Sequence, residues 1–242
     1  PSCGHEVVDA TDPALTIPTS PVKTAVSRQG VTLENGLVRI KINPKGQLTS
    51  VYDLCAQRET LAGPGNVFHL HEDIPNQWDA WDVDAFYKER FDILEASDSL
   101  ELVEAGPLRA SVRVTRTFGQ SRLAQNIVLR ADSPRIDFIT EVDWQESQKF
   151  LKVAFPVEIR SPRAPLSPEP LADRGRQVFT YALFPHAGDV REGGVIAEAY
   201  ALNVPLHLQT VPSQAGTLPA SHSFFQVDRP GVVIEAVKRA ED

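Results

Sequence analysis

The sequence predicts an all-β fold, built as a large antiparallel β-sandwich with a smaller C-terminal β segment. Short segments of alternating apolar and polar residues succeed one another at about ten-residue spacing between residues 30 and 160. Turn-forming residues separate these segments, and amphipathic helical periodicity is nearly absent from the same region. Strands that follow one another without intervening helices are typical of antiparallel sandwiches rather than of βαβ folds.

The first clear strand is the segment GLVRIKI, residues 36–42. On an extended segment, Val38, Ile40 and Ile42 fall on one face, while Leu37 lies with the charged residues on the other. This alternation predicts one face buried in a core and one face turned to solvent.

The segment RASVRVTRTF, residues 109–118, continues the series by alternating Val112 and Val114 with Arg113 and Thr115. Further segments of the same period are QNIVLR, RIDFITEVDW and KFLKVAFPVEI. Turn chemistry separates the strands at NPKG (43–46), GP (106–107) and ADSP (131–134).

Residues 161–176, SPRAPLSPEPLADRGR, interrupt the pattern with four prolines in their first ten positions. Proline cannot donate a hydrogen bond to a sheet, so this segment is predicted to be a linker or a loop. Beyond it, QVFTYALFPH predicts a strand and REGGVIAEAYALNVPL predicts a short helix. TLPASHSFFQVD and GVVIEAVKRAED predict two final strands.

The chain is therefore divided into a leading segment (1–29), the main sandwich (30–160), the proline-rich linker (161–176) and the remainder of the β-domain (177–242). It begins without an initiator methionine and contains no methionine at all. We interpret it as a fragment of a longer polypeptide, truncated at its C-terminal end.

Charge and composition exclude several classes of partner. The net charge of −8 and the lack of a basic cluster argue against a nucleic acid. No apolar run approaches the roughly 20 residues that span a bilayer, and no signal-peptide pattern opens the chain, so no membrane is expected. The two cysteines, Cys3 and Cys55, are too few for a disulfide framework, which favours a location in the reducing cytoplasm. A single disulfide bond is the alternative.

The densest chemistry lies in NQWDAWDVDAFYKER, residues 76–90. Glycosidases place two carboxyl groups roughly 5 to 9.5 Å apart, and on a strand Asp82 and Asp84 would share a face about 7 Å apart. A solvated strand face has the same pattern, so we predict no catalytic residue in this chain. The spacing also lacks the glycine and the distal glutamate of a helix-loop-helix calcium site.

A sugar-contacting role fits these residue types better. Trp78 and Trp81 offer flat apolar faces, and the neighbouring carboxylates of Asp79 and Asp82 accept hydrogen bonds from hydroxyl groups. The alternative, that one tryptophan fills the sandwich core, stays open.

The segment HLHED would place His69 and His71 on one face of a strand, in the manner of a metal site. Such pairs are common by chance and no third histidine lies near in sequence, so no metal ligand is predicted. His186 occupies the turn FPHAGD without an evident partner. The sequence also lacks a nucleophile elbow, a phosphate loop and a dinucleotide fingerprint.

Several stretches together resemble the C-terminal β-domain of glycoside hydrolase family 38 α-mannosidases, of the bacterial and cytosolic type. They include LENGLVRIKINPKGQLTSVYDLCAQRETL, GNVFHLHEDIPNQWDAWDVDAFY, FLKVAFPVEI, ADRGRQVFTYALFPHAGD, AYALNVPL, SFFQVD and VVIEAVKRAED. The resemblance covers residues 33–242 in the same order, and DAWD is its sharpest motif.

This resemblance implies a galactose mutarotase-like supersandwich that belongs to a retaining enzyme. The family cleaves α-mannosidic bonds with an aspartate nucleophile and a zinc ion held in an N-terminal α/β domain, which this chain lacks. The chain alone is thus expected to be inactive and to hold no cofactor, with zinc present in the intact enzyme. Its implied partners are that catalytic domain, a mannose-containing oligosaccharide and a second copy in a homo-oligomer.

The resemblance also places DAWD near the mouth of the active site, which makes Trp81, Asp82 and Asp79 substrate-side or interdomain contacts. Two alternatives stay open. One is a free-standing carbohydrate-binding module with the same sandwich, and the other is a mutarotase-like epimerase that would use His186 and His71.

One departure from the family carries a prediction. In relatives a long stretch follows the strand similar to VAFPVEI, whereas here the chain passes almost directly into PLSPEPLADRG. We expect residues to be missing near 161–166 and at the end of the chain. A sandwich without them should be incomplete.

Overall fold

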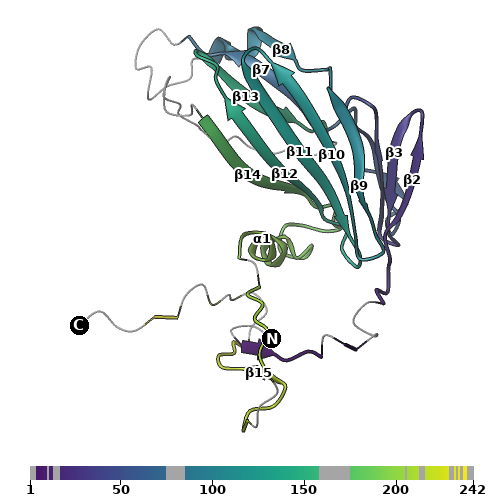
Figure 1. The fold of residues 1–242 in the computed structure, drawn as a ribbon, viewed down its shortest axis with the longest axis vertical. Coiled ribbons are helices and arrows are strands. Elements are labelled where there is room, and N and C mark those ends of the chain that lie inside the picture. The colour runs from purple at the N-terminus through teal and green to yellow at the C-terminus, as the bar shows by residue number, and fades with distance from the viewer. Residues whose placement is uncertain are drawn as a thin grey trace. The chain divides into compact units, whose positions relative to one another are not determined.

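Three antiparallel β-sheets form the larger of two units in the computed structural model (Figure 1). The larger unit comprises Ile17–Pro185, and the smaller one joins Pro1–Thr16 to His186–Asp242. The structure describes residues 4–9, 11–12, 17–74, 85–157, 175–204, 206–212 and 216–228, with residues 232, 234, 237 and 238.

The N-terminal sheet of the larger unit has the order β2-β3-β4-β5-β6, so each strand pairs with its neighbour in sequence. Its strands are β2 (Lys23–Ser27), β3 (Gly30–Glu34), β4 (Val38–Ile42), β5 (Leu48–Asp53) and β6 (Arg58–Glu59). Strand β4 follows the predicted alternation, since Val38, Ile40 and Ile42 are buried and Lys41 is exposed. The prediction for this strand is confirmed.

The central sheet has the order β14-β12-β11-β10-β9 and contains the longest strands. Its members are β9 (Ser99–Ala105), β10 (Arg109–Phe118), β11 (Ser121–Arg130), β12 (Ile136–Trp144) and β14 (Gly175–Leu183). Figure 1 shows β10, β11 and β12 side by side, as their register requires. Strand β14 pairs with β12 from Leu183 opposite Ile136 to Gly175 opposite Trp144.

The third sheet has the order β13-β7-β8. It consists of β7 (Val67–Glu72), β8 (Phe91–Ile93) and β13 (Lys149–Ala154), and the 3₁₀ helix η2 (Ala85–Glu89) lies just before β8. Strand β13 continues directly from β12 through residues 145–148, which carries the chain from the central sheet to the third.

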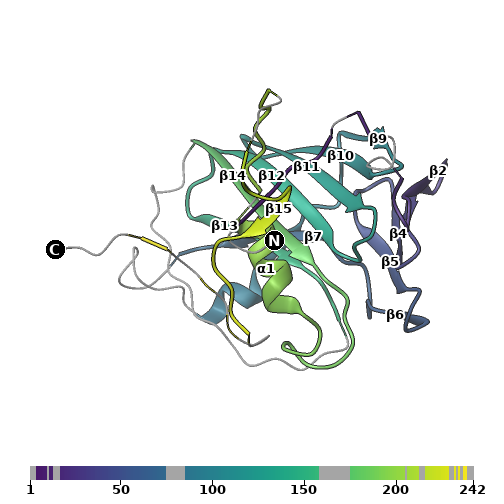
Figure 2. The same cartoon turned by 90° about the horizontal axis from the view of Figure 1, so that it is seen from below.

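Two hydrophobic clusters hold the sheets together, and both use the central sheet. The first joins it to the N-terminal sheet through residues such as Leu33, Ile40, Ile127 and Phe138, all fully buried. The second joins it to the third sheet and contains Phe68, Leu70, Phe118, Leu123, Val142 and Trp144. Figure 2 views the sandwich from below, with β4 and β5 in a layer apart from β10 and β11. The predicted all-β antiparallel sandwich is confirmed.

Buried polar side chains between the sheets bond to one another. Asn66 donates to Gln125 Oε1 over 2.7 Å and accepts from the Tyr181 hydroxyl over 2.8 Å. Gln125 in turn donates to Thr140 Oγ1 over 2.9 Å. Burial raises the pKa of Tyr181, so its phenol stays protonated and keeps its role as a donor. The network ties β11, β12 and β14 to the start of β7.

The smaller unit contains the strands β1 (Gly4–Glu6) and β15 (Ser221–Ser223), which pair antiparallel, and the helix α1 (Val195–Asn203). The helix confirms the one predicted in this region. The segment 217–228 is predicted as one strand, but the strand covers only Ser221–Ser223, which pair with Gly4–Glu6. In the last predicted strand, the described residues 232, 234, 237 and 238 are not in a strand.

No helix in the described part of the chain is long and apolar enough to cross a membrane.

Candidate functional site

The predicted sugar-contacting residues Asp79, Trp81 and Asp82 lie outside the described residues, as do Trp78 and Asp84. The structure describes the elements on either side of them. Strand β7 ends before this segment and η2 and β8 follow it, and β7 and β8 pair with His69 opposite Ile93 and His71 opposite Phe91. Both ends of the segment are therefore anchored to the third sheet.

An aromatic–histidine cluster, made of His69, His71, Tyr87, Phe91 and Phe150, lies on this sheet. On β7, Phe68 and Leu70 belong to the second hydrophobic cluster, so the period of two places both histidines on the opposite face. The prediction that the two histidines share a strand face is confirmed. Strand β13 adds Phe150 directly opposite His71.

The rings of the cluster pack closely. The His71 ring is stacked on the Phe150 ring, with centroids 5.0 Å apart and planes 9° apart. The His69 ring is stacked on the Phe91 ring at 4.7 Å, and the two imidazole centroids lie 5.9 Å apart. The Tyr87 ring meets the His71 ring edge-on at 5.2 Å. Such offset and edge contacts are the favourable arrangements of aromatic rings.

His71 links β7 to η2 through its imidazole. Its Nδ1 lies 2.9 Å from the backbone carbonyl oxygen of Tyr87, and because a carbonyl only accepts, Nδ1 carries the proton. In the neutral ring the Nε2 atom then presents a lone pair, which is buried and has no hydrogen-bond partner among the described residues. The side chain is only 4% exposed, so this unmet acceptor costs about 1–3 kcal/mol.

A lysine–tyrosine pair borders the cluster. The ammonium group of Lys152 donates to the Tyr87 hydroxyl over 2.6 Å and lies 3.8 Å from the centre of the same ring. This hydrogen bond is the main reason that the pKa of Tyr87 falls below its ordinary value. Burial, and next the nearby His71, lower the pKa of His69.

The cluster does not meet the needs of a metal ion on its own. Structural zinc takes four ligands, and catalytic zinc takes three from the protein. Within the described ranges, no group of three or more histidine, cysteine or acidic side chains comes together. His186, the other histidine of the predicted epimerase, belongs to the smaller unit, whereas His71 belongs to the larger. Its Nδ1 lies 3.2 Å from the carbonyl oxygen of Ala187.

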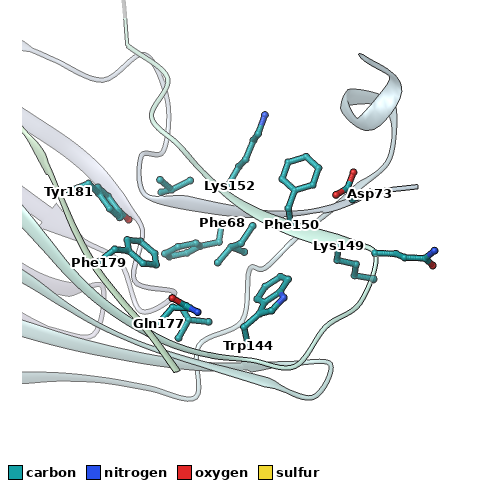
Figure 3. Close-up of a pocket in the computed structure, with 13 residues that line it drawn as sticks. Phe68, Asp73, Trp144, Lys149, Phe150, Lys152, Gln177, Phe179 and Tyr181 are labelled. Carbon is teal, nitrogen blue, oxygen red and sulfur yellow. The ribbon is translucent and has the colours of Figure 1, made fainter. Parts of the chain in front are cut away.

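A cavity of about 370 Å³ opens between the central sheet and the third sheet (Figure 3). Strands β12 and β14 line it on one side and β7 and β13 on the other, together with Asp73 just after β7 and Gln148 just before β13. The strand residues that line it are Phe68, Val142, Trp144, Lys149, Phe150, Leu151, Lys152, Val153, Gln177, Phe179 and Tyr181. Figure 3 shows Phe68, Trp144 and Phe179 turned towards the cavity, whereas Phe150 and Lys152 project from the other side of β13.

Among the described residues that line this cavity, Asp73 is the only carboxylate. Hydrolysis of a glycosidic bond needs two carboxyl groups on opposite sides of the bond. The described lining supplies one carboxyl group of the two that such a reaction uses.

Sequence reasoning missed most of these residues. It found His69 and His71 from their period of two. Phe150 and Lys152 join them through the pairing of β13 with β7, which brings together segments about 80 residues apart, and Tyr87 joins them from η2 through its contacts with His71. Nothing local in the sequence specifies that register.

Residues 33–167 match the family model described as the glycosyl hydrolases family 38 C-terminal domain. The chain is 35% identical to "Alpha-mannosidase 2C1" of Homo sapiens over 296 residues, an alignment that covers 93% of this chain and 28% of the relative. It is 24% identical to "Alpha-mannosidase G" of Dictyostelium discoideum over 287 residues, covering 88% of this chain and 26% of that protein. The chain thus spans little more than a quarter of these relatives.

Solved structures share the fold. The crystal structure of an alpha-mannosidase from Enterococcus faecalis V583 superposes with a TM-score of 0.63 at 14% identity, covering 82% of this chain and 34% of that chain. A second structure, of a protein in glycosyl hydrolase family 38 from Enterococcus faecalis, superposes with a TM-score of 0.61, also at 14% identity, and covers 80% of this chain and 34% of that chain.

The alignments are longer than the chain itself. The alignment with the human relative is 296 residues long, whereas this chain has 242 residues, of which 93% are aligned. Several tens of residues of the relative therefore have no counterpart within the aligned part of this chain.

Proposed function

Because this chain belongs to the family of the glycosyl hydrolases family 38 C-terminal domain, we propose that it is the non-catalytic β-domain of a larger alpha-mannosidase. The observation that carries the proposal is a family match over residues 33–167 in a chain that spans 28% of a relative called an alpha-mannosidase. In this proposal the intact enzyme hydrolyses α-mannosidic bonds with retention. The β-domain supports the catalytic domain and lines part of the substrate site.

The residues proposed to face substrate are Trp81, Asp82 and Asp79. An indole face packs against the apolar face of a sugar ring, and a carboxylate accepts hydrogen bonds from its hydroxyl groups. These contacts bind and orient mannose and leave bond cleavage to the catalytic domain.

The aromatic–histidine cluster gives this segment a rigid base. Two contacts hold the His71 side chain in position. Its ring stacks on Phe150, and its Nδ1 donates to the backbone carbonyl of Tyr87, which follows the segment in sequence. Sites held by packed elements keep their geometry better than sites on loops alone. We assign His71 and Tyr87 a positioning role.

Zinc, which the family resemblance assigns to the intact enzyme, supplies Lewis-acid polarisation of the sugar when bound. The described residues offer no set of ligands for it. We therefore assign the metal to the catalytic domain, and this chain's own residues to binding and support. An intracellular location is also proposed, and the exposed free thiol of Cys55 agrees with a reducing compartment.

The proposal is tested by assaying an aryl α-mannoside with zinc supplied. We expect no turnover above background from this chain alone, and turnover once it is fused to the N-terminal part of human Alpha-mannosidase 2C1 that precedes the aligned region. The same N-terminal part without this chain is the control. Turnover by the chain unaided would contradict the proposal.

The partly exposed aromatic–histidine cluster supports a second candidate, a free-standing carbohydrate-binding module. Phe91, at 41% exposure, would be the accessible ring. Titration calorimetry of the isolated chain with mannose separates the two. Saturable binding by the chain alone favours the module, and its absence favours the enzyme part.

A further inference from the structure

We propose that the pair Asn35–Gly36 is a modification site that becomes reactive only when the hairpin of β3 and β4 unfolds. In the unfolded hairpin the side-chain amide of Asn35 is lost as ammonia. The product, an aspartate or an isoaspartate at position 35, no longer fits the sandwich. This chemistry is independent of mannosidase activity.

The sequence supplies the reactive pair. Asn35 precedes Gly36, and no other asparagine of the sequence precedes a glycine. The backbone nitrogen of the residue after an asparagine can attack the side-chain carbonyl carbon, and glycine hinders this attack least because it has no Cβ.

The reaction needs no partner other than water. A bond forms between the Gly36 nitrogen and Asn35 Cγ, the Cγ–Nδ2 bond breaks, and Nδ2 leaves as ammonia with the proton of the Gly36 amide. Water then opens the resulting succinimide ring at either of its carbonyl groups. One opening gives an aspartate, and the other gives an isoaspartate, whose backbone runs through the former side chain.

In the folded chain, hydrogen bonds hold the Asn35 amide in place. Its Nδ2 donates to the carbonyl oxygens of Arg130 and Ser133, both over 2.7 Å. Its Oδ1 accepts from the backbone N–H groups of Leu37 and Val38 over 3.0 and 2.9 Å. A side-chain amide donates two hydrogen bonds and accepts two, so its capacity is filled, and the residue is only 1% exposed. Ring closure therefore requires these hydrogen bonds to break first.

The same hydrogen bonds explain why the product does not fit. A carboxylate only accepts, so an oxygen in place of Nδ2 would face the carbonyl oxygens of Arg130 and Ser133 with no proton between them. Burying a charge without a donor is more costly than burying a neutral polar group. An isoaspartate also inserts an extra methylene group into the backbone, next to the point where Glu34 pairs with Arg39.

The effect of the modification extends to the central sheet. Arg130 and Ser133 flank the turn between β11 and β12, and Asn35 ties this turn to the N-terminal sheet. Asp132, in the same turn, accepts from the backbone N–H of Ser20 over 2.6 Å, and its own N–H donates to the Ser20 carbonyl over 3.3 Å. Loss of the Asn35 amide should therefore also loosen the segment that leads into β2.

The first test measures the rate of amide loss. The full chain is incubated in mildly alkaline buffer with and without unfolding guanidinium chloride, and peptide mass spectrometry follows Asn35. We expect loss at least about tenfold faster in the unfolded chain, because only open molecules react. Gly36→Ala should slow the reaction in guanidinium chloride. Asn203, exposed and followed by valine, is the control in the same digest and should react slowly in both conditions.

The second test examines the product. Asn35→Asp should lower the urea midpoint of unfolding and speed hydrogen exchange of the Asp132 amide at least about tenfold. Asn203→Asp makes the same chemical change at an exposed position and should alter neither. An Asn35→Asp chain that does not fold, beside a folded Asn203→Asp chain, also supports the proposal.

Two results would overturn the proposal. One is an equal rate of amide loss at Asn35 in the folded and the unfolded chain, because the fold would then give no protection. The other is an Asn35→Asp chain with the urea midpoint and the Asp132 exchange rate of the unmodified chain, because the product would then fit.

Discussion

At the scale of single residues, His71 has one ring nitrogen in a hydrogen bond and the other buried without one. Its Nδ1 proton is donated to the Tyr87 carbonyl, while Nε2 is buried and meets no donor among the described residues. Stacking on Phe150 and a tilted ring contact with Phe91 offset the cost of that buried lone pair. The His71 side chain thus stabilises the fold more through the packing of its ring than through its hydrogen bond.

Shortening His71 should therefore matter more than removing its nitrogens. We expect His71→Ala to lower the free energy of unfolding by about 2–4 kcal/mol, because it leaves a cavity among aromatic rings. His71→Phe should stay within about 1 kcal/mol, since it removes the unmet acceptor along with one hydrogen bond. Urea unfolding of the three proteins measures both. A larger loss of unfolding free energy in His71→Phe than in His71→Ala would show that the hydrogen bond contributes more than the packing of the ring.

Asp82 is the residue whose proposed contact with substrate is most directly testable. In the full-length enzyme, Asp82→Ala should raise KM or lower kcat at least about tenfold, equivalent to about 1.4 kcal/mol of transition-state binding. Steady-state kinetics on a mannoside measures the change. Asp92→Ala on β8, an exposed carboxylate of the same length, is the matched control. Unchanged kinetics in a folded Asp82 variant would remove this residue from the site.

At the scale of elements, Arg116 shows how one side chain holds two loops through three backbone carbonyl groups. Its guanidinium donates to the carbonyl oxygens of Leu94 and Ala96 over 2.7 and 3.0 Å, and to that of Lys45 over 2.6 Å. The residue is 2% exposed, and its charge also lies over the Phe68 ring. Burial lowers the pKa of Arg116, yet a guanidinium stays protonated in proteins. Strand β10 is thereby tied to the turn 43–46.

Replacing Arg116 should be among the most destabilising single substitutions in the larger unit. Arg116→Ala removes a fully buried side chain and leaves three carbonyl groups without this donor, and we expect a loss of about 3–5 kcal/mol in the free energy of unfolding. Arg113→Ala, on the same strand but exposed, should change it by less than about 0.5 kcal/mol. Urea denaturation of both variants measures the difference. Equal losses of unfolding free energy in the two variants would mean that water replaces the guanidinium as the donor to these carbonyl groups.

At the scale of the whole molecule, the two units differ in how well they bury apolar surface. The larger unit contains every residue of both hydrophobic clusters. In the described part of the smaller unit, α1 buries none of its residues, and Leu206 and Leu208 are 90% and 92% exposed. Burial of apolar area is the main favourable term in folding, so the larger unit holds most of the stability.

A shortened chain tests this division. Residues 17–185 expressed alone should fold, with a urea midpoint equal within error to that of the full chain, because none of their sheets includes a strand of the smaller unit. Circular dichroism at increasing urea measures the midpoint. A clear drop in the midpoint would show that the smaller unit stabilises the sandwich.

The local pattern of the sequence determined the strands and the class of fold, because alternation with a period of two depends only on which face of a strand is buried. It placed Val38, Ile40 and Ile42 correctly, and it put His69 and His71 on one face. It also located the helix that the structure shows at Val195–Asn203. The roles of Asp79, Trp81 and Asp82, and the missing residues near 161–166, remain predictions outside the described residues.

Only the tertiary structure decided which strands meet. Thr115 and Arg116 are adjacent and both buried, against a simple alternation, because loops cover β10 on one face while β9 pairs beside it. The cavity between the central sheet and the third sheet also depends on long-range pairing, since β14 pairs with β12 although a proline-rich segment separates them in sequence. Such pairings are set by the packing of whole sheets, and alternation within one strand carries no information about the identity of its neighbour.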